Sequence, residues 1–370
     1  MAMQRVTYLD GWRGLAILFV LLDHFGDIER FHFGNFGVEL FFVLSGRLMA
    51  ELLVVQATPW RTFLWRRFSR IYPGLLAFCL LMLIVSNLRP LYPAYAPSIS
   101  IREFLAGILF VMNYAAPRYP DILTIDHIWS VCVEEHAYLI LVLIALAARR
   151  WAAPRSEPEG ASLDPDAGTL PSKAGAERLF PIIAVCLAAA MMVSGIVQAL
   201  FTQQNEHELF WRTDVRAASV LLPFAVYLTV RPLDRLRRGA ALPPWLATTT
   251  FLLALILSDQ MFPAWMQYTL GTIALAISVS TIDFAAPSLL RALRSPWLTA
   301  FGLLSYSLYL WQQPFYKFSN IIGTGPAMAG TALAATASYA LVEKPCRSAL
   351  NRLWRQRMRK HGVGCHKSRR

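Results

Sequence analysis

The chain has 370 residues, of which 56% are hydrophobic and only 16% are charged. A typical soluble domain carries about 25% charged residues. This composition excludes a disordered chain, a coiled coil and an ordinary soluble enzyme. It predicts a protein that lies mostly in lipid.

The formal net charge is +12. In a soluble protein such a balance would raise the question of nucleic-acid binding, but membrane proteins concentrate Lys and Arg in their cytoplasmic loops. We therefore expect membrane lipid as a partner, and no nucleic acid. None of the five cysteines forms a CxxC pair, so we expect neither a disulfide framework nor a metal site.

Long apolar runs predict the membrane spans, each of which needs about 20 mostly apolar residues. Ten are predicted, within residues 11–30, 36–55, 71–88, 128–148, 179–205, 217–230, 239–258, 260–282, 295–316 and 318–342. The run 104–117 has only 14 residues and is predicted to be a short re-entrant or interfacial helix. If this run crossed the membrane, the basic loops that follow it would lie outside the cell, against the positive-inside rule. We expect an all-α, polytopic transmembrane helical bundle with both termini in the cytoplasm.

The predicted organisation is one membrane domain over residues 1–346, followed by a basic cytoplasmic tail over 347–370. Residues 151–178 are rich in Pro, Ala, Ser and Gly and predict a flexible cytoplasmic linker within that domain. Residues 56–70 hold four arginines and are predicted to form a cytoplasmic loop.

The first two predicted helices carry several ionisable residues, each costing roughly 2.5 to 3.5 kcal/mol at the centre of a membrane helix. Arg13 and His24 are eleven residues apart. This spacing places them within about 20° of one another on one helix face, about 16 Å apart along the axis, and Asp10 within about 40° of His24. The face predicts a polar tunnel with a cation at one end and a proton acceptor at the other. Alternatively, Arg13 snorkels to inner headgroups and His24 caps the outer interface.

Two further groups of charges have competing explanations. Arg47 and Glu51 are spaced i, i+4, which predicts an ion pair that lets the second helix insert. Arg67 and Arg70 are spaced i, i+3 beside Tyr72, so a helix here would give them one cationic face. Guanidinium groups suit phosphates, and inner-leaflet lipid is the alternative ligand.

Glu134 and Glu135 begin another span, shortly after Trp129 and Ser130. A helix capped by Ser130, with an acidic first turn, would account for one of the two glutamates. A carboxylate that orients a nearby imidazole is the functional interpretation.

Several segments, taken in order, resemble the acyltransferase 3 family of integral-membrane acyltransferases. They are LDGWRGLAILFVLLDH at 9–24, GVELFFVLSG at 37–46, RRFSRIYP at 66–73, HIWSVCVEEHAYL at 127–139, TDVRAASVLL at 213–222, SYSLYLWQQP at 305–314 and VEKP at 342–345. The family's R-x10-H signature falls on Arg13 and His24. The resemblance covers roughly residues 5–346.

Members of this family O-acylate sugars in surface polysaccharides, lipopolysaccharide and related glycoconjugates. The resemblance implies a bacterial inner-membrane O-acetyltransferase that uses acetyl-CoA, or another acyl-CoA, as donor substrate, with no permanently bound cofactor. It implies His24, Arg13 and Glu134 as catalytic residues. The acyl-CoA-binding residues would be Arg67, Arg70 and Tyr72. Residues lining the acceptor site or tunnel would be Asp10, Trp129, Glu135, Arg216, Tyr309, Trp311 and Gln312.

The chain departs from the family pattern at three positions. Gln312 stands where the late motif usually has His, Arg47 follows FFVLSG in place of an apolar residue, and Ala137 replaces an aromatic. Gln cannot take a proton, which leaves His24 as the best-supported base. The chain ends about 25 residues after Pro345, so we expect no fused esterase-like domain.

A transporter or flippase for a glycolipid or small solute is the alternative function, with Arg13 and His24 in its translocation pathway. The absence of a visible inverted repeat and the clustering of charges in the first two helices both favour the enzyme.

Overall fold

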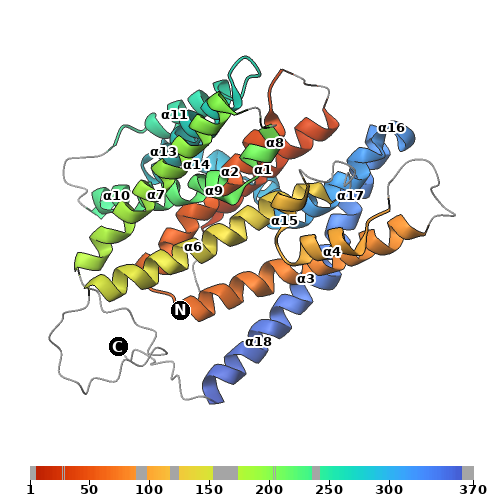
Figure 1. Cartoon of the computed structure of the whole chain (residues 1–370), viewed down its shortest axis with the longest axis horizontal. Helices are drawn as coiled ribbons and strands as arrows, with labels where there is room; N and C mark the ends of the chain where they lie inside the picture. Colours follow the sequence, from red (N-terminus) through yellow and green to blue (C-terminus); the bar gives the residue numbers. More distant parts are fainter. Residues whose placement is uncertain are drawn as a thin grey trace.

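The computed structural model describes residues 6–88, 98–116, 125–152, 174–235 and 242–360, apart from residues 27, 29, 203 and 205. Within these ranges the chain is helical almost throughout, and the β-contact found there is an isolated bridge between Phe31 and Asp259. The predicted all-α class is therefore confirmed (Figure 1). Most of the predicted linker, the residues 236–241 and the end of the tail from 361 lie outside the described residues.

The principal helices of the bundle follow the predicted spans. They are α1 (Thr7–Phe25), α2 (Phe33–Ala50), α3 (Trp60–Asn87), α6 (Trp129–Ala152), α7 (Ala174–Phe201), α10 (Ala218–Arg235), α11 (Leu246–Ile256), α13 (Thr272–Ser280), α15 (Pro296–Lys317) and α17 (Thr324–Ser338). Single π-helical segments continue three of these helices: η1 (Glu51–Val55) follows α2, η4 (Gln267–Gly271) precedes α13 and η6 (Tyr339–Glu343) follows α17.

The other elements connect or flank these helices. They are α4 (Ile101–Ile108), α5 (Met112–Ala115), η3 (Asp126–Ile128), α8 (Glu206–Phe210), α9 (Thr213–Arg216), α12 (Ala264–Met266), η5 (Ile282–Phe284), α14 (Pro287–Leu293), α16 (Ser319–Ile322) and α18 (Lys344–Lys360). The segment predicted to be re-entrant or interfacial thus forms two short helices, α4 and α5, each too short to cross a bilayer.

Four helical segments of the described chain are long and apolar enough to cross a membrane: Trp60–Asn87, Asp126–Ala148, Leu179–Phe201 and Thr213–Pro232. Large apolar side chains on them face outward, among them Leu143 and Val193, which are 64% and 58% exposed. Such exposure suits a lipid environment, because lipid tails solvate apolar side chains.

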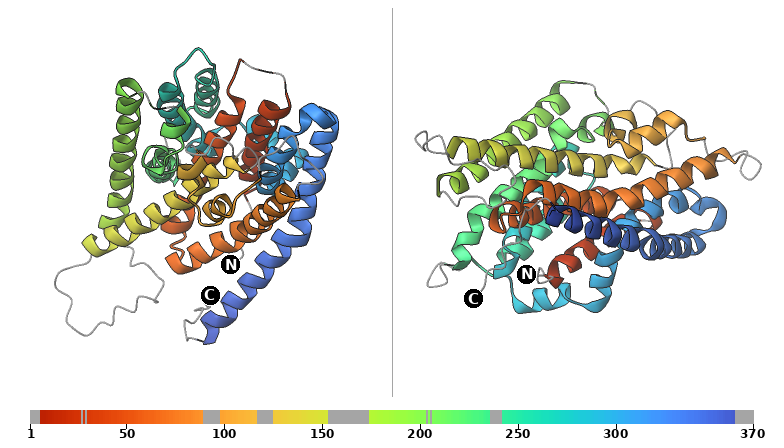
Figure 2. Two further views of the ribbon diagram at one scale, coloured as in Figure 1. Left: turned by 45° about the vertical axis from the view of Figure 1, so that its right-hand side comes forward. Right: turned by 90° about the horizontal axis from the view of Figure 1, so that it is seen from below.

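Helix α3 begins earlier than predicted. It starts at Trp60, so the four arginines at 61, 66, 67 and 70 lie on its first turns and not in a loop. Its 28 residues make it about 42 Å long, which exceeds a hydrocarbon core of about 30 Å. Helix α18 packs against α3, and its C-terminal end extends past the rest of the bundle (Figure 2). The rings of Trp65 on α3 and Trp354 on α18 stack with their centres 5.0 Å apart.

Helices α1 and α15 pack with their backbones in contact. A Cβ atom at Gly302 would lie 1.8 Å from the carbonyl oxygen of Asp10, and one at Gly14 would lie 2.0 Å from that of Leu298. Only glycine fits at such separations. This contact places the late motif of α15 beside the α1 face that carries Arg13 and His24.

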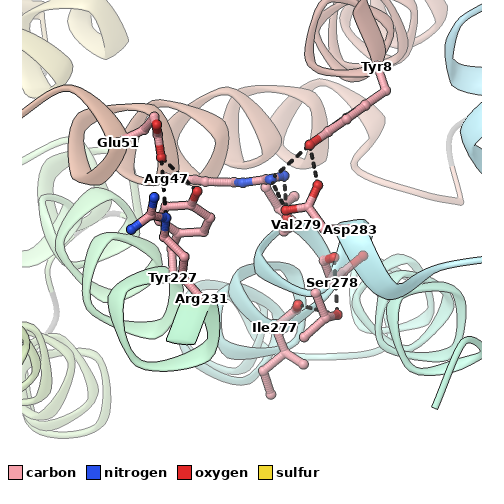
Figure 3. Close-up of polar contacts among 10 residues, drawn as sticks. Tyr8, Arg47, Glu51, Tyr227, Arg231, Ile277, Ser278, Val279 and Asp283 are labelled. Carbon is pink, nitrogen blue, oxygen red and sulfur yellow. Dashed lines mark hydrogen bonds and ion pairs between the residues drawn. The ribbon is translucent and has the colours of Figure 1, made fainter. Parts of the chain in front are cut away.

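The predicted Arg47–Glu51 ion pair is wrong (Figure 3). Arg47 Nη2 lies 2.6 Å from Asp283 Oδ2 of η5, and Nη1 donates to the carbonyl oxygen of Val279 at 2.8 Å. Glu51 instead accepts a hydrogen bond from the Tyr227 hydroxyl at 2.8 Å. Partners on other helices are closer to Arg47 than its helical neighbour, and the i, i+4 spacing alone cannot reveal them.

We expect Asp283→Asn to destabilise the fold by roughly 3–5 kcal/mol, because it leaves the buried Arg47 charge without its counterion. Glu51→Gln is the matched control and should cost about 1 kcal/mol or less, since its cationic partner Arg231 is 29% exposed and lies 3.8 Å away. The free energy of unfolding in mixed detergent micelles measures both. Equal losses in the two variants would contradict this assignment.

Candidate functional site

Three guanidinium groups meet at one end of the α1 face. Arg13 of α1 lies close enough to Arg67 and Arg70 of α3 for their charges to interact. Arg67 is only 6% exposed, and Arg13 Nη1 is 3.9 Å from Asp10 Oδ1. Like charges held together in a partly buried site repel one another, so the site favours negatively charged partners or ligands.

The carboxylates of α6 supply part of that negative charge. Glu134 Oε1 accepts hydrogen bonds from the hydroxyls of Ser45 and Tyr138. Arg67 Nη1 lies 3.4 Å from the Tyr138 hydroxyl oxygen, and Arg67 Cζ is 4.9 Å from the centre of that ring. Glu135 interacts with the charges of Arg67 and Arg70. We call the residues Asp10, Arg13, Arg67, Arg70, Glu134 and Glu135 the arginine cluster.

His24 occupies the other end of the same face, near the end of α1. Its ring centre is 4.5 Å from that of Tyr316 on α15. Gln312 and Lys317 also lie beside the His24 ring. Its Nδ1 atom is buried and has no hydrogen-bond partner among the described residues. The structure therefore places Gln312 with His24 and groups Glu134 with the arginines, so the expected Glu134–His24 contact is not formed.

Helix α15 contributes two more predicted residues, Tyr309 and Trp311, to the histidine end. The Tyr309 hydroxyl donates to the carbonyl oxygen of His127 at 2.8 Å and lies 2.6 Å from Ser130 Oγ. The Trp311 ring meets Phe78 edge-on, 5.2 Å between centres. Ser130 lies inside α6 and hydrogen-bonds across to α15, so the helix cap expected from Ser130 is wrong.

His127 is a residue of this site that sequence reasoning missed. It lies in η3, is 6% exposed, and is close enough to His24 for the two rings to interact electrostatically. Its Nε2 atom is 3.2 Å from the carbonyl oxygen of Leu310. Its place two residues before Trp129 in the matched segment was the available signal. We call His24, His127 and Gln312 the histidine cluster.

Three predicted residues lie away from both clusters. Arg216 Nη2 forms a buried ion pair with Glu39 Oε2 at 2.6 Å, and its Cζ is 3.8 Å from the ring centre of Tyr268. Trp129 stacks on Trp211 with ring centres 5.1 Å apart. Tyr72 follows Arg70 by two residues on α3, so it is turned about 200° away from it around the helix. Its ring stacks on that of Phe68, with ring centres 4.6 Å apart. Within the described ranges, no group of three or more His, Cys, Asp and Glu side chains is placed to hold a metal ion.

Comparison with known proteins identifies related membrane enzymes. Residues 6–342 match the model of a protein family described as an acyltransferase domain. The chain is 25% identical to the O-acetyltransferase OatA of Staphylococcus aureus over 386 aligned positions, which cover 92% of this chain and 57% of that protein. It is 25% identical to the putative membrane-bound transacylase BcsY of Komagataeibacter xylinus, over 91% of this chain and 81% of that protein.

The peptidoglycan O-acetyltransferase OatA of Listeria monocytogenes is 24% identical, over 92% of this chain and 56% of that protein. The chain thus spans a little over half the length of the Staphylococcus and Listeria relatives. No solved structure matches the chain.

Proposed function

Because the chain belongs to the acyltransferase 3 family of membrane acyltransferases, we propose that it moves an acyl group, in the first instance acetyl, from cytoplasmic acyl-CoA to a hydroxyl of a glycan or glycoconjugate. The observation that carries the proposal is the α1 face, with the arginine cluster at one end and His24 at the other. The names of the relatives support an O-acetyl product on a surface polysaccharide.

The arginine cluster is the proposed donor site. CoA carries phosphate groups, and guanidinium groups bind phosphate with two parallel hydrogen bonds. Arg13, Arg67 and Arg70 repel one another, although carboxylates of Asp10 and Glu134 lie close enough to offset part of that repulsion. A bound CoA would relieve that repulsion, with its long pantetheine arm directed along α1 toward His24.

The histidine cluster is the proposed reaction centre. An imidazole of ordinary pKa near 6.5 is partly neutral at working pH and can take a proton or receive an acyl group. His24 has a buried Nδ1 atom without a partner in the described part of the chain. Tyr309, Trp311 and Gln312 would line the path of the acceptor, and Glu134 would act at the donor end.

We further infer ten membrane spans, formed by α1, α2, α3, α6, α7, α10, α11, α12–α13, α15 and α17 with their π-helical extensions. The start of α3, the end of α6 and the end of α18 lie toward the same end of the bundle in the views of Figures 1 and 2. These helix ends carry many arginines, which supports a cytoplasmic location for this end and for both termini.

We expect His24→Ala to abolish transfer of acetyl to surface glycans, since removing a catalytic imidazole costs about 10²–10⁴-fold in rate or more. Mass spectrometry of glycans from cells with matched amounts of membrane protein checks this. His32→Ala, at the start of α2, is the control and should leave the acetyl mass increment in place. Unchanged acetylation in the His24 variant would contradict the assignment.

We expect Arg67→Ala and Arg70→Ala to raise the KM for acetyl-CoA by about 10- to 100-fold, the equivalent of losing one charged hydrogen bond of 1.5–3 kcal/mol. Arg66→Ala is the matched control, because Arg66 is the exposed neighbour on the same helix. Steady-state assays of CoA release in nanodiscs provide the measurement. A KM that does not change in the Arg67 and Arg70 variants would exclude a phosphate-binding role.

A further inference from the structure

A proline in α15 leaves one carbonyl of that helix without its usual partner. Pro314 lies inside α15 and has no N–H, so the carbonyl oxygen of Leu310, four residues earlier, receives no helical hydrogen bond. His127 Nε2 lies 3.2 Å from this oxygen. The imidazole thus replaces the missing backbone donor and joins η3 to α15.

This contact fixes the tautomer of His127. A carbonyl oxygen can only accept, so Nε2 must carry the proton, and Nδ1 of the neutral ring is then a hydrogen-bond acceptor. Nδ1 is buried and has no partner among the described residues. The structural role toward Leu310 explains Nε2, but it does not explain why a buried basic nitrogen is left unpaired.

Two further buried polar atoms of the histidine cluster lack partners within the described ranges. Gln312 is fully buried, and its Oε1 atom also lacks a partner in the described chain, as does His24 Nδ1. An unpaired buried acceptor costs free energy, and His127 and Gln312 each present one beside His24. A ligand that donates hydrogen bonds satisfies them, and a polyhydroxylated acceptor has such donors.

We propose that His127 is a second catalytic base, whose Nδ1 binds the acceptor hydroxyl and takes its proton. The proposal rests on the proposed acyl transfer.

In the first step a His24 nitrogen attacks the thioester carbonyl, the C–S bond breaks, and the imidazole proton passes to the CoA thiolate. In the second step the acceptor oxygen attacks the acyl carbon while Nδ1 of His127 takes the hydroxyl proton. The C–N bond breaks, and that proton returns to His24.

The assignment also accounts for Gln312. Gln cannot act as a base, so a second imidazole in this chain must come from another position. His127 supplies it from η3, held in place through Leu310, while Gln312 contributes an acceptor that orients the substrate hydroxyls.

The test uses His127→Gln in the full-length protein. The Gln amide nitrogen can donate to Leu310 as Nε2 does, but no basic nitrogen replaces Nδ1. His136→Gln is the matched control, because His136 lies on α6, outside the histidine cluster, and its Nδ1 atom hydrogen-bonds Thr213 Oγ1 at 2.7 Å. Two measurements separate the two steps. Hydroxylamine-dependent release of CoA from acetyl-CoA in nanodiscs reports the first step, because it requires no base for the acceptor hydroxyl. Ester-linked acetate on the glycans of expressing cells reports both steps together.

We expect His127→Gln to keep hydroxylamine-dependent CoA release within about threefold of wild type while glycan acetate falls by about 10²-fold or more. Glycan acetate within a few-fold of wild type would overturn the proposal, and so would equal loss of both activities in folded protein. If His127→Gln does not fold, His127→Asn is measured in the same way. A wild type without CoA release and without glycan acetate would instead overturn the proposed function.

Discussion

The contact between α1 and α15 is the constraint on which the candidate site depends. Gly14 and Gly302 let the two backbones touch, and no larger residue could occupy either position without moving a helix. This contact brings His24 beside Gln312 and Tyr316. Pro314 leaves the Leu310 carbonyl oxygen of α15 without its helical hydrogen bond, and His127 Nε2 binds that oxygen. Glycine and proline residues therefore position the polar groups.

The charged residues within the bundle divide into two kinds. Arg47 and Arg216 are each neutralised by one carboxylate from another helix, Asp283 and Glu39. Such pairs hold helices in register in an apolar protein. The arginine cluster differs, because three cations crowd into one site and repel one another even with carboxylates beside them. An arrangement that works against stability is a mark of a binding or catalytic site, and here it lies at one end of α1.

Part of this site could be predicted from the sequence. Helical periodicity alone placed Arg13 and His24 on one face, and it predicted a shared face for Arg67 and Arg70 if their segment was helical. The start of α3 could not be predicted, because its first turns are too polar to resemble a membrane helix. The Arg47–Asp283 pair joins residues far apart in the chain, and the role of His127 depends on a carbonyl freed by Pro314. Contacts of this kind depend on tertiary packing, which no local pattern reveals.

The central claim is that donor and acceptor reach opposite ends of α1. The most direct test seals labelled acetyl-CoA inside right-side-out membrane vesicles from expressing cells and follows the label on glycans at the outer surface. We expect label outside with wild type and none with His24→Ala. Labelling that requires acetyl-CoA on the outer side would contradict the account, because donor and acceptor would then meet on one side of the membrane.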